Sequence, residues 1–358
     1  MSCCDRGKLP RRRRAHARDE RAPVTVVVRV PNWLGDCVMS LPALRAIKQA
    51  HGDEEVMVIA HDSVVPLYRC VSEIDDVLGF AFKTDEGKAA ARAALRQHQD
   101  SRGYLFVNSF SGAWQFWRAG VHERIGFNRG INRLLLTRAV DDRSFAGRHQ
   151  VHRYLGLVEA ATGFRGDPGA FLLTPPAEAM RKADKLLGGT PAAGRGYFVV
   201  HPGAQYGPAK RWPATKFRDA AAAVAAATGL VPAIVAGPRD EGAAACPDGG
   251  VDLSGKTPLP VLLALFARAA FALVNDSGPM HLAAASGTKV IALFLSTDPG
   301  ATAPLGEGHQ LLTADVSCRP CLKRTCPRKH YQCAEALTKE TVVAAAQRLL
   351  ASGVTVQQ

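Results

Sequence analysis

The chain has 358 residues, of which 47% are hydrophobic and 22% charged, and its formal net charge is +13. The length predicts about two globular domains, and a membrane-spanning helix is excluded because the longest apolar candidate, residues 259–278, is interrupted by Arg268. The positive charge favours phosphate-rich partners (nucleotides, anionic lipid surfaces or nucleic acid) without choosing among them.

The first 23 residues form a basic segment with eight Lys or Arg and three Asp or Glu. This segment lacks the apolar core of a secretion signal, so we expect a disordered tail on a cytoplasmic protein. A reducing compartment predicts that the nine cysteines are free thiols or metal ligands rather than disulfides.

Strands alternating with helices are predicted in the first half, residues 24–185. A β-branched run at 24–30 is typical of a buried parallel strand, and residues 37–52 follow with helical apolar spacing and a terminal glycine. The alternation continues with a strand at 55–60, a helix at 86–99 and a strand at 104–110. A stretch rich in Pro, Gly and Ala, from about 175 to 196, predicts a domain linker.

The same alternation restarts in the second half, residues 195–335. The predicted elements are a strand and turn at 196–203, a helix at 213–229, a strand at 230–237, a helix at 258–269, a strand at 271–275, a helix at 279–287 and a strand at 289–294. This pattern indicates two parallel sheets with a cleft between the domains. Residues 336–358 are expected to form a C-terminal helix and tail that pack back on the N-terminal domain.

The loops after the strands are the expected ligand site, because open α/β sheets bind ligands at the carboxyl ends of their strands. The first such loop carries Asp36 at the start of a helix. An acidic residue there serves either as the helix N-cap or as a general base facing the cleft. Position alone favours the N-cap and leaves both interpretations open.

A second loop, residues 201–213, combines two glycines with two cations. Gly203 and Gly207 permit a close backbone approach. Lys210 and Arg211 lie just before the next helix, where a fixed cation would stabilise a diphosphate leaving group. The alternative is a solvated basic turn.

A third loop is the turn Asp276, Ser277 and Gly278, which opens a helix with His281 in its first turn. Free N–H groups and the dipole of such a helix start favour a phosphate. The alternative is an ordinary capped helix with His281 as a capping or surface residue.

Residues 250–257 match G-x-x-x-x-G-K-[ST], the phosphate-binding loop of many ATPases and kinases. That loop requires a preceding strand, whereas the only strand-like residues here lie inside the match. A P-loop NTPase or kinase is therefore a remote alternative. A nucleic-acid binder is also disfavoured, because no binding module or aromatic-interleaved basic stripe occurs outside the tail.

Four cysteines cluster near the C-terminus: Cys318, Cys321, Cys326 and Cys333, with His330 among them. Four soft ligands in one loop form a weak candidate for a structural zinc site. Their spacing is looser than a paired C-x2-C arrangement, so buried free thiols are the preferred interpretation.

Three motifs in order resemble the ADP-heptose:lipopolysaccharide heptosyltransferases (glycosyltransferase family 9), and most closely their type II members. These motifs are NWLGD at 32–36, HPGAQYGPAKRWP at 201–213 and NDSGPMHLAAA at 275–285. Supporting stretches are NSFSGAWQFWRAGVHERIGF at 108–127, HRYLGLVEAATG at 152–163 and the ending CRPCLKRTCPRKHYQCAEAL at 318–337. The resemblance runs from about Val24 to the C-terminal helix.

The resemblance implies an α/β GT-B fold, in which two Rossmann-like parallel-sheet domains face a central cleft. Residues 24–185 correspond to the acceptor-binding domain and 195–335 to the nucleotide-sugar domain. The implied reaction is inverting transfer of L-glycero-D-manno-heptose from ADP-L-glycero-β-D-manno-heptose to the first heptose of the lipopolysaccharide inner core. Another acceptor position or a related nucleotide-sugar is the alternative within the family. No cofactor is expected.

The resemblance also assigns roles to the loop residues. Asp36 matches the base that takes the acceptor proton, and Lys210 matches the cation that holds the diphosphate. Either Asp240 or Glu241 is expected near the ribose. Donor binding is further assigned to Gly203, Thr257, Asp276, Ser277, Gly278 and His281.

The implied acceptor is a membrane lipid, lipid A-Kdo-heptose. The expected workplace is therefore the cytoplasmic face of the inner membrane, where a basic surface suits the lipid phosphates. Peripheral contact with that membrane is expected, and no nucleic-acid partner.

Overall fold

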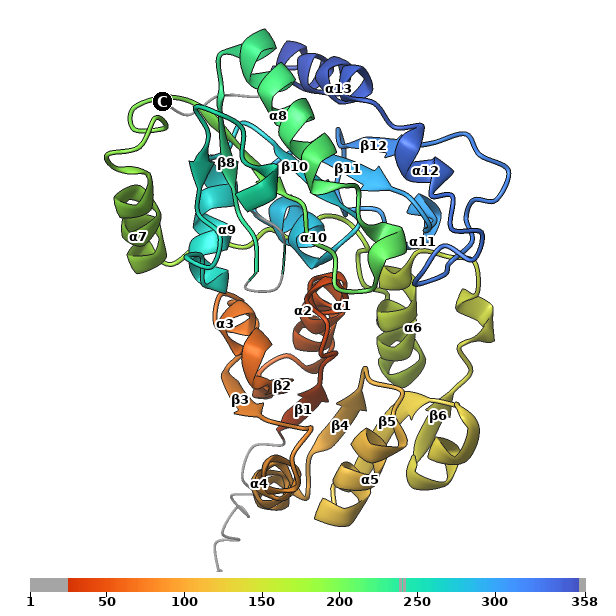
Figure 1. The fold of residues 1–358 in the computed structure, drawn as a ribbon. Coiled ribbons are helices and arrows are strands. Elements are labelled where there is room, and N and C mark those ends of the chain that lie inside the picture. The colour runs from red at the N-terminus through yellow and green to blue at the C-terminus, as the bar shows by residue number, and fades with distance from the viewer. Residues whose placement is uncertain (1–24, 238–239, 241–242, 354–358) are drawn as a thin grey trace, which may run out of the picture.

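The computed structural model describes residues 25–237, 240 and 243–353. In this part of the chain, two six-stranded sheets, both entirely parallel, lie one above the other with helices packed on them (Figure 1). The strand orders are β3-β2-β1-β4-β5-β6 and β12-β11-β10-β7-β8-β9. The predicted α/β architecture with two parallel-sheet domains is confirmed.

The strands of the first sheet are β1 (Val26–Arg29), β2 (Val56–His61), β3 (Asp76–Phe80), β4 (Arg102–Leu105), β5 (Glu123–Phe127) and β6 (Arg138–Val140). Those of the second are β7 (Tyr197–His201), β8 (Val231–Ile234), β9 (Val251–Asp252), β10 (Ala272–Asn275), β11 (Val290–Phe294) and β12 (Gln310–Thr313). β1 and β10 lie at the middle of their sheets and are buried throughout, because apolar residues cover both faces of a parallel sheet.

The helices of the first half are α1 (Leu34–Met39), α2 (Leu41–His51), α3 (Val65–Tyr68), α4 (Asp85–Leu95), α5 (Phe110–Ala119) and α6 (Gln150–Thr162). Those of the second half are α7 (Ala177–Leu187), α8 (Ala214–Thr228), α9 (Leu259–Arg268), α10 (Gly278–Ala285), α11 (Pro299–Thr302), α12 (Gln332–Glu335) and α13 (Lys339–Ala351). Among the described residues, none of these helices has the length and hydropathy needed to cross a bilayer.

The predicted helix at 37–52 is two helices, α1 and α2, which meet at Ser40. The Ser40 hydroxyl donates to the Cys37 carbonyl at 2.7 Å, and Pro42 supplies no N–H to continue the ladder. The first of these helices begins at Leu34, earlier than predicted. As a result, Asp36 lies inside α1 rather than before it.

The two domains touch through α1 and α10, which meet at the centre of the molecule (Figure 1). A Cβ added to Gly278 would lie 2.8 Å from Leu34 Cβ, and one added to Gly35 would lie 3.1 Å from His281 Cδ2. Glycine at these two positions lets the helices approach closely. This contact forms the floor of the cleft described below.

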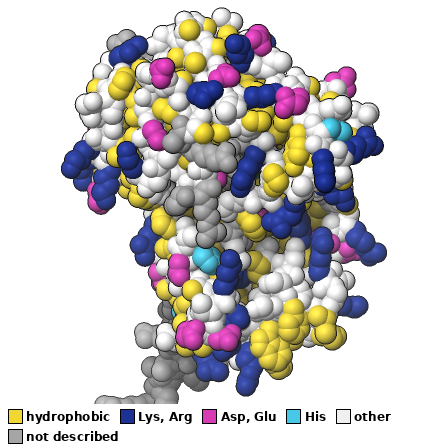
Figure 2. Space-filling view, viewed as in Figure 1, with side chains coloured by type: hydrophobic (Ala, Val, Ile, Leu, Met, Phe, Trp, Pro, Cys, Tyr) yellow, Lys and Arg dark blue, Asp and Glu magenta, His cyan; other side chains and the backbone are white. Residues whose placement is uncertain are grey.

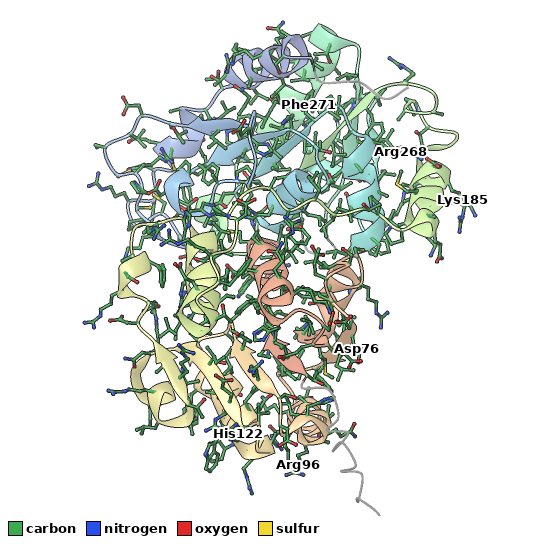
Figure 3. The ribbon with its side chains drawn as sticks, turned by 180° about the vertical axis from the view of Figure 1, so that it is seen from behind. Asp76, Arg96, His122, Lys185, Arg268 and Phe271 are labelled. Atoms are coloured by element: carbon green, nitrogen blue, oxygen red, sulfur yellow. The ribbon has the colours of Figure 1, made fainter. Side chains whose placement is uncertain are left out.

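Two predicted domain assignments are wrong. The boundary at residue 185 falls inside α7, which packs beside α9 of the second domain (Figures 1 and 3). The helix α13 packs on α8 and β12 of the second sheet instead of returning to the N-terminal domain. In both cases the packing follows from an apolar stripe along the helix, which is buried in the adjoining core. The stripe consists of Ala179, Ala183 and Leu187 in α7, and of Val342, Ala345, Ala346 and Leu349 in α13.

Candidate functional site

A cleft of about 680 Å³ lies between the domains, at the carboxyl ends of the strands. Eight of the predicted site residues line it: Asp36, Lys210, Asp240, Thr257, Asp276, Ser277, Gly278 and His281. Gly203 lies behind this lining, and Glu241 lies outside the described residues. The structure therefore brings residues far apart in sequence to one ligand-sized cavity.

Asp36 is the main ionisable group on the N-terminal side of the cleft. The residue preceding α1 is Trp33, and Asp36 makes no cap bond there, so the N-cap interpretation is wrong. Its Oδ1 instead accepts from Gln150 Nε2 of α6 at 3.2 Å. Burial raises the pKa of this carboxyl, and the charges of Lys210 and Arg153 oppose that rise. A desolvated carboxylate facing a cleft is suited to accept a proton.

Lys210 is the main cation on the opposite side. It ends a 3-10 turn, Pro208–Lys210, and its Nζ lies 2.6 Å from Asp276 Oδ2, with both side chains largely buried. The Thr297 hydroxyl donates to the same carboxylate oxygen at 2.5 Å. Asp276 is thus engaged within the protein, and it orients Lys210 toward the cleft.

Ser277 immediately precedes α10, whose N-terminus opens on the cleft. Its backbone is extended and its side chain caps nothing in the helix. Its hydroxyl oxygen is buried with no hydrogen-bond partner among the described residues. An unpartnered buried hydroxyl beside a helix N-terminus is suited to receive an oxyanion such as a phosphate.

His281 is only 4% exposed and packs against Gly35 where the domains meet. Burial lowers its pKa to about 4, against the charge of Asp276, which favours protonation. The side chain is therefore neutral at neutral pH. It contributes packing and neutral hydrogen-bonding capacity to the site, not a positive charge.

This depressed pKa predicts an acid-sensitive contact. The pKa of His281 is lower in the folded protein than the 6.5 of the unfolded chain, so protonation favours unfolding. The contribution of neutral His281 to the free energy of unfolding is therefore present above pH 6.5 and is lost as the pH falls toward 4. Between about pH 7 and about pH 5, we expect the unfolding free energy of the wild type to fall by about 2 kcal/mol more than that of His281→Gln. Urea unfolding at the two pH values measures the difference, and equal pH slopes would contradict the assignment.

Asp240 occupies the far end of the cleft, after β8. Its Oδ2 accepts from the Gly237 N–H at 3.1 Å and lies 3.9 Å from His201 Nε2. A Cβ on Gly203 would lie 2.4 Å from this carboxyl group. The group that lies close to the backbone of Gly203 is thus the side chain of Asp240.

Several site residues were not anticipated from the sequence. Gln150 and Arg153 act on Asp36 from more than a hundred residues away. Asn275 joins two loops, since its side chain donates to the Pro202 carbonyl at 2.6 Å and accepts from the Trp212 N–H at 3.1 Å. The position of Asn275 at the end of β10 is the one signal that could have indicated it.

The P-loop match at 250–257 does not form a phosphate cradle. β9 lies within the match, and the Lys256 ammonium donates to the Asp252 carbonyl of the same loop at 3.4 Å. Only Thr257 of this stretch lines the cleft. The stretch contributes an edge strand and a turn to the fold.

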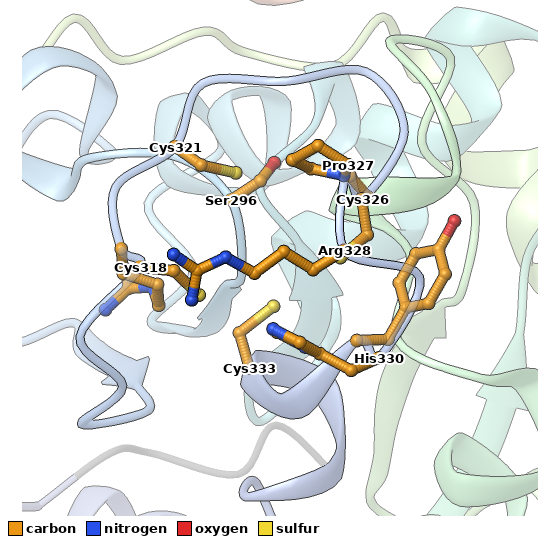
Figure 4. Close-up of a pocket in the computed structure, with 11 residues that line it drawn as sticks. Ser296, Cys318, Cys321, Cys326, Pro327, Arg328, His330 and Cys333 are labelled. Atoms are coloured by element: carbon orange, nitrogen blue, oxygen red, sulfur yellow. The ribbon is translucent and has the colours of Figure 1, made fainter.

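The four clustered cysteines line a second, small cavity of about 30 Å³ together with His330 (Figure 4). Backbone N–H groups, foremost that of Tyr331, lower the pKa of the Cys326 thiol, whereas burial raises that of Cys333. Within the described part of the chain, no three His, Cys, Asp or Glu side chains form a group that could hold a metal ion. Free thiols stay a prediction, which metal analysis of protein purified without added zinc will decide.

Comparison with known proteins identifies the family of this chain. The model of glycosyltransferase family 9 (heptosyltransferase) matches residues 89–332. The chain belongs to glycosyltransferase family 9. It is therefore a glycosyltransferase, and the cleft is its candidate active site.

Similar proteins match nearly the whole chain. Lipooligosaccharide heptosyltransferase 2 of Campylobacter jejuni is 25% identical over 342 residues, which cover 91% of this chain and 98% of that protein. The structure of Escherichia coli ADP-heptose lipopolysaccharide heptosyltransferase II superposes with a TM-score of 0.74 at 22% identity, covering 92% and 99% of the two chains. A family 9 structure from Veillonella parvula gives a TM-score of 0.79 at 19% identity, with 92% and 98% covered. The fold is thus the GT-B fold of these enzymes.

Proposed function

We propose that this enzyme transfers L-glycero-D-manno-heptose from ADP-L-glycero-β-D-manno-heptose to the first heptose of a lipid A-Kdo-heptose acceptor, with inversion. The observation that carries the proposal is one cleft with Asp36 on its N-terminal side and Lys210 and Ser277 on the other. The names of the relatives, heptosyltransferases 2 and II, support the sugar and the position of transfer.

Inversion requires a single in-line displacement. The acceptor hydroxyl oxygen forms a bond to the anomeric carbon as the bond from that carbon to the β-phosphate oxygen breaks, and ADP leaves with the electron pair. Asp36 takes the hydroxyl proton, for which its desolvated carboxylate is suited. One base is sufficient, and no covalent enzyme intermediate forms.

The leaving diphosphate gains negative charge during this step. Lys210, the N-terminus of α10 and the Ser277 hydroxyl provide the compensating groups. We propose no cofactor beyond the donor, since these groups supply the charge that the step needs. At the adenosine end, Asp240 is the proposed ribose contact, and Thr257 borders the adenine.

The proposed acceptor also indicates where in the cell the enzyme acts. A lipid-linked sugar is held at the cytoplasmic face of the inner membrane, and a net charge of +13 favours the approach of the protein to anionic lipid. We propose peripheral contact with that membrane and no nucleic-acid partner.

A transfer assay tests the proposed function. ADP-heptose is supplied with two truncated acceptors, one ending at Kdo and one ending at the first heptose, and mass spectrometry detects the addition of one heptose. We expect addition only to the second acceptor. Addition to the Kdo-terminated acceptor, or activity only with another nucleotide-sugar, would assign the enzyme a different position within family 9.

A further inference from the structure

An exposed apolar patch lies on the N-terminal domain, away from the cleft. Three aromatic side chains of α5, Phe110, Trp114 and Trp117, are 39–45% exposed. Ile131 and Leu134, from the adjacent 3-10 turn η3 (Gly130–Leu135), are 63% and 80% exposed. Figure 2 shows hydrophobic side chains gathered over α5, with Lys and Arg side chains nearby.

The spacing of these aromatics gives α5 a second apolar face. Phe110, Trp114 and Trp117 recur at intervals of four and three residues, so they share one side of the helix. Their rings form a row, with centroid distances of 5.9 Å and 4.9 Å between successive members. Ala113 and Phe116 occupy the other side and are buried in the core. The exposed face is therefore not needed to attach the helix to its sheet.

The two segments that carry the patch bear only basic charges. Residues 108–122 and 128–140 contain four arginines and no Asp or Glu. Arg118 and Arg133 are exposed and form no ion pair within the described residues, whereas Arg129 pairs with Asp142. A second copy of this patch would bring like charges together. An anionic surface would complement them.

We propose that this α5–η3 patch docks the enzyme on the anionic surface of a lipid bilayer. Tryptophan rings prefer the headgroup level of a membrane, where their apolar and polar edges are both satisfied. The exposed guanidinium groups of Arg118 and Arg133 bind lipid phosphates. The proposal rests on the proposed function only for the identity of the membrane, which is the inner membrane. Docking through this patch brings the domain that carries Asp36 to the lipid surface.

Vesicle binding by the full-length protein tests the docking surface without donor or acceptor. The variants are Trp114→Ser/Trp117→Ser, the charge reversal Arg118→Glu/Arg133→Glu, and a control, Leu172→Ser/Leu311→Ser, at exposed apolar positions outside the patch. All retain the basic first 23 residues, so attraction due to that segment is common to every sample. Co-sedimentation is measured with phosphatidylcholine vesicles that contain or lack phosphatidylglycerol.

We expect each patch variant to bind the anionic vesicles at least about tenfold more weakly, while the control binds like the wild type. Brominated acyl chains should quench the fluorescence of the wild type but not of the double tryptophan variant. Equal binding by all proteins would overturn the proposal, as would a concentration-dependent dimer that the tryptophan variant abolishes without change in vesicle binding. Transfer to a lipid-free acceptor oligosaccharide is assayed separately. If the wild type shows no transfer to this acceptor, the proposed function is refuted, whereas the result on vesicle docking is unaffected.

Discussion

Asp36→Asn is expected to lower kcat by about 10²–10⁴-fold while the affinity for ADP changes little. The amide keeps the shape of the side chain but cannot take a proton from the acceptor hydroxyl. Steady-state kinetics with donor and acceptor measure kcat, and calorimetry measures ADP binding. Asp53→Asn, the same change at an exposed position of the same domain, is the control and should leave both unchanged.

The stability of this variant separates catalysis from structure. Burial raises the pKa of Asp36 in the folded protein, so the ionised form lowers stability at pH values above the unfolded pKa. Asn removes that charge, and the melting temperature of Asp36→Asn should therefore rise. Turnover near the wild-type value would exclude Asp36 as the base. A fall in both turnover and melting temperature would assign it a structural role.

The same pKa shift fixes the direction of the pH profile. The base must be deprotonated, so kcat/KM should rise with pH as Asp36 ionises, at a pH above the usual range of an aspartate. This acid limb should be absent from the residual activity of Asp36→Asn.

Lys210→Met is expected to lower kcat by about 10²–10³-fold and to weaken ADP binding, because the leaving diphosphate loses its fixed cation. It should also lower the free energy of unfolding by about 3 kcal/mol. The reason is that Asp276, only 3% exposed, keeps the Thr297 hydroxyl as a partner but loses its countercharge.

A double variant distinguishes these two effects. Lys210→Met/Asp276→Asn removes both charges of the buried pair, so stability should recover while turnover stays low. Lys182→Met is the matched control, since its ion pair with Glu178 is well exposed and should contribute less than about 1 kcal/mol. Wild-type turnover in the double variant would show that Lys210 serves only to neutralise Asp276.

Local sequence patterns were sufficient for the central strands, for several helices and for the loops that carry the site. The β-branched run at β1 and the glycine that ends α8 act through neighbouring residues only. Parallel strands also place their carboxyl ends on one edge of a sheet, so the loops bearing Lys210 and Ser277 could be assigned to one site before any contact was known. The resemblance to family 9 added the loop of Asp36, which follows a strand of the other sheet.

The partners of those residues were not predictable in the same way. The choice between N-cap and base for Asp36 depended on where α1 begins and on Gln150, 114 positions away. The neutral state of His281 follows from burial against the opposite domain.

The sequence by itself thus determined two parallel α/β sheets, the strand-end loops and a cation with a helix start for a phosphate, because each depends on residues close together in the chain. Only the tertiary structure decided that Lys210 is held by Asp276, that the Ser277 hydroxyl has no partner among the described residues, and that α7 and α13 both belong to the second domain. These outcomes depend on which buried surfaces meet across long sequence separations, and burial and hydrogen-bond satisfaction are properties of the packed molecule.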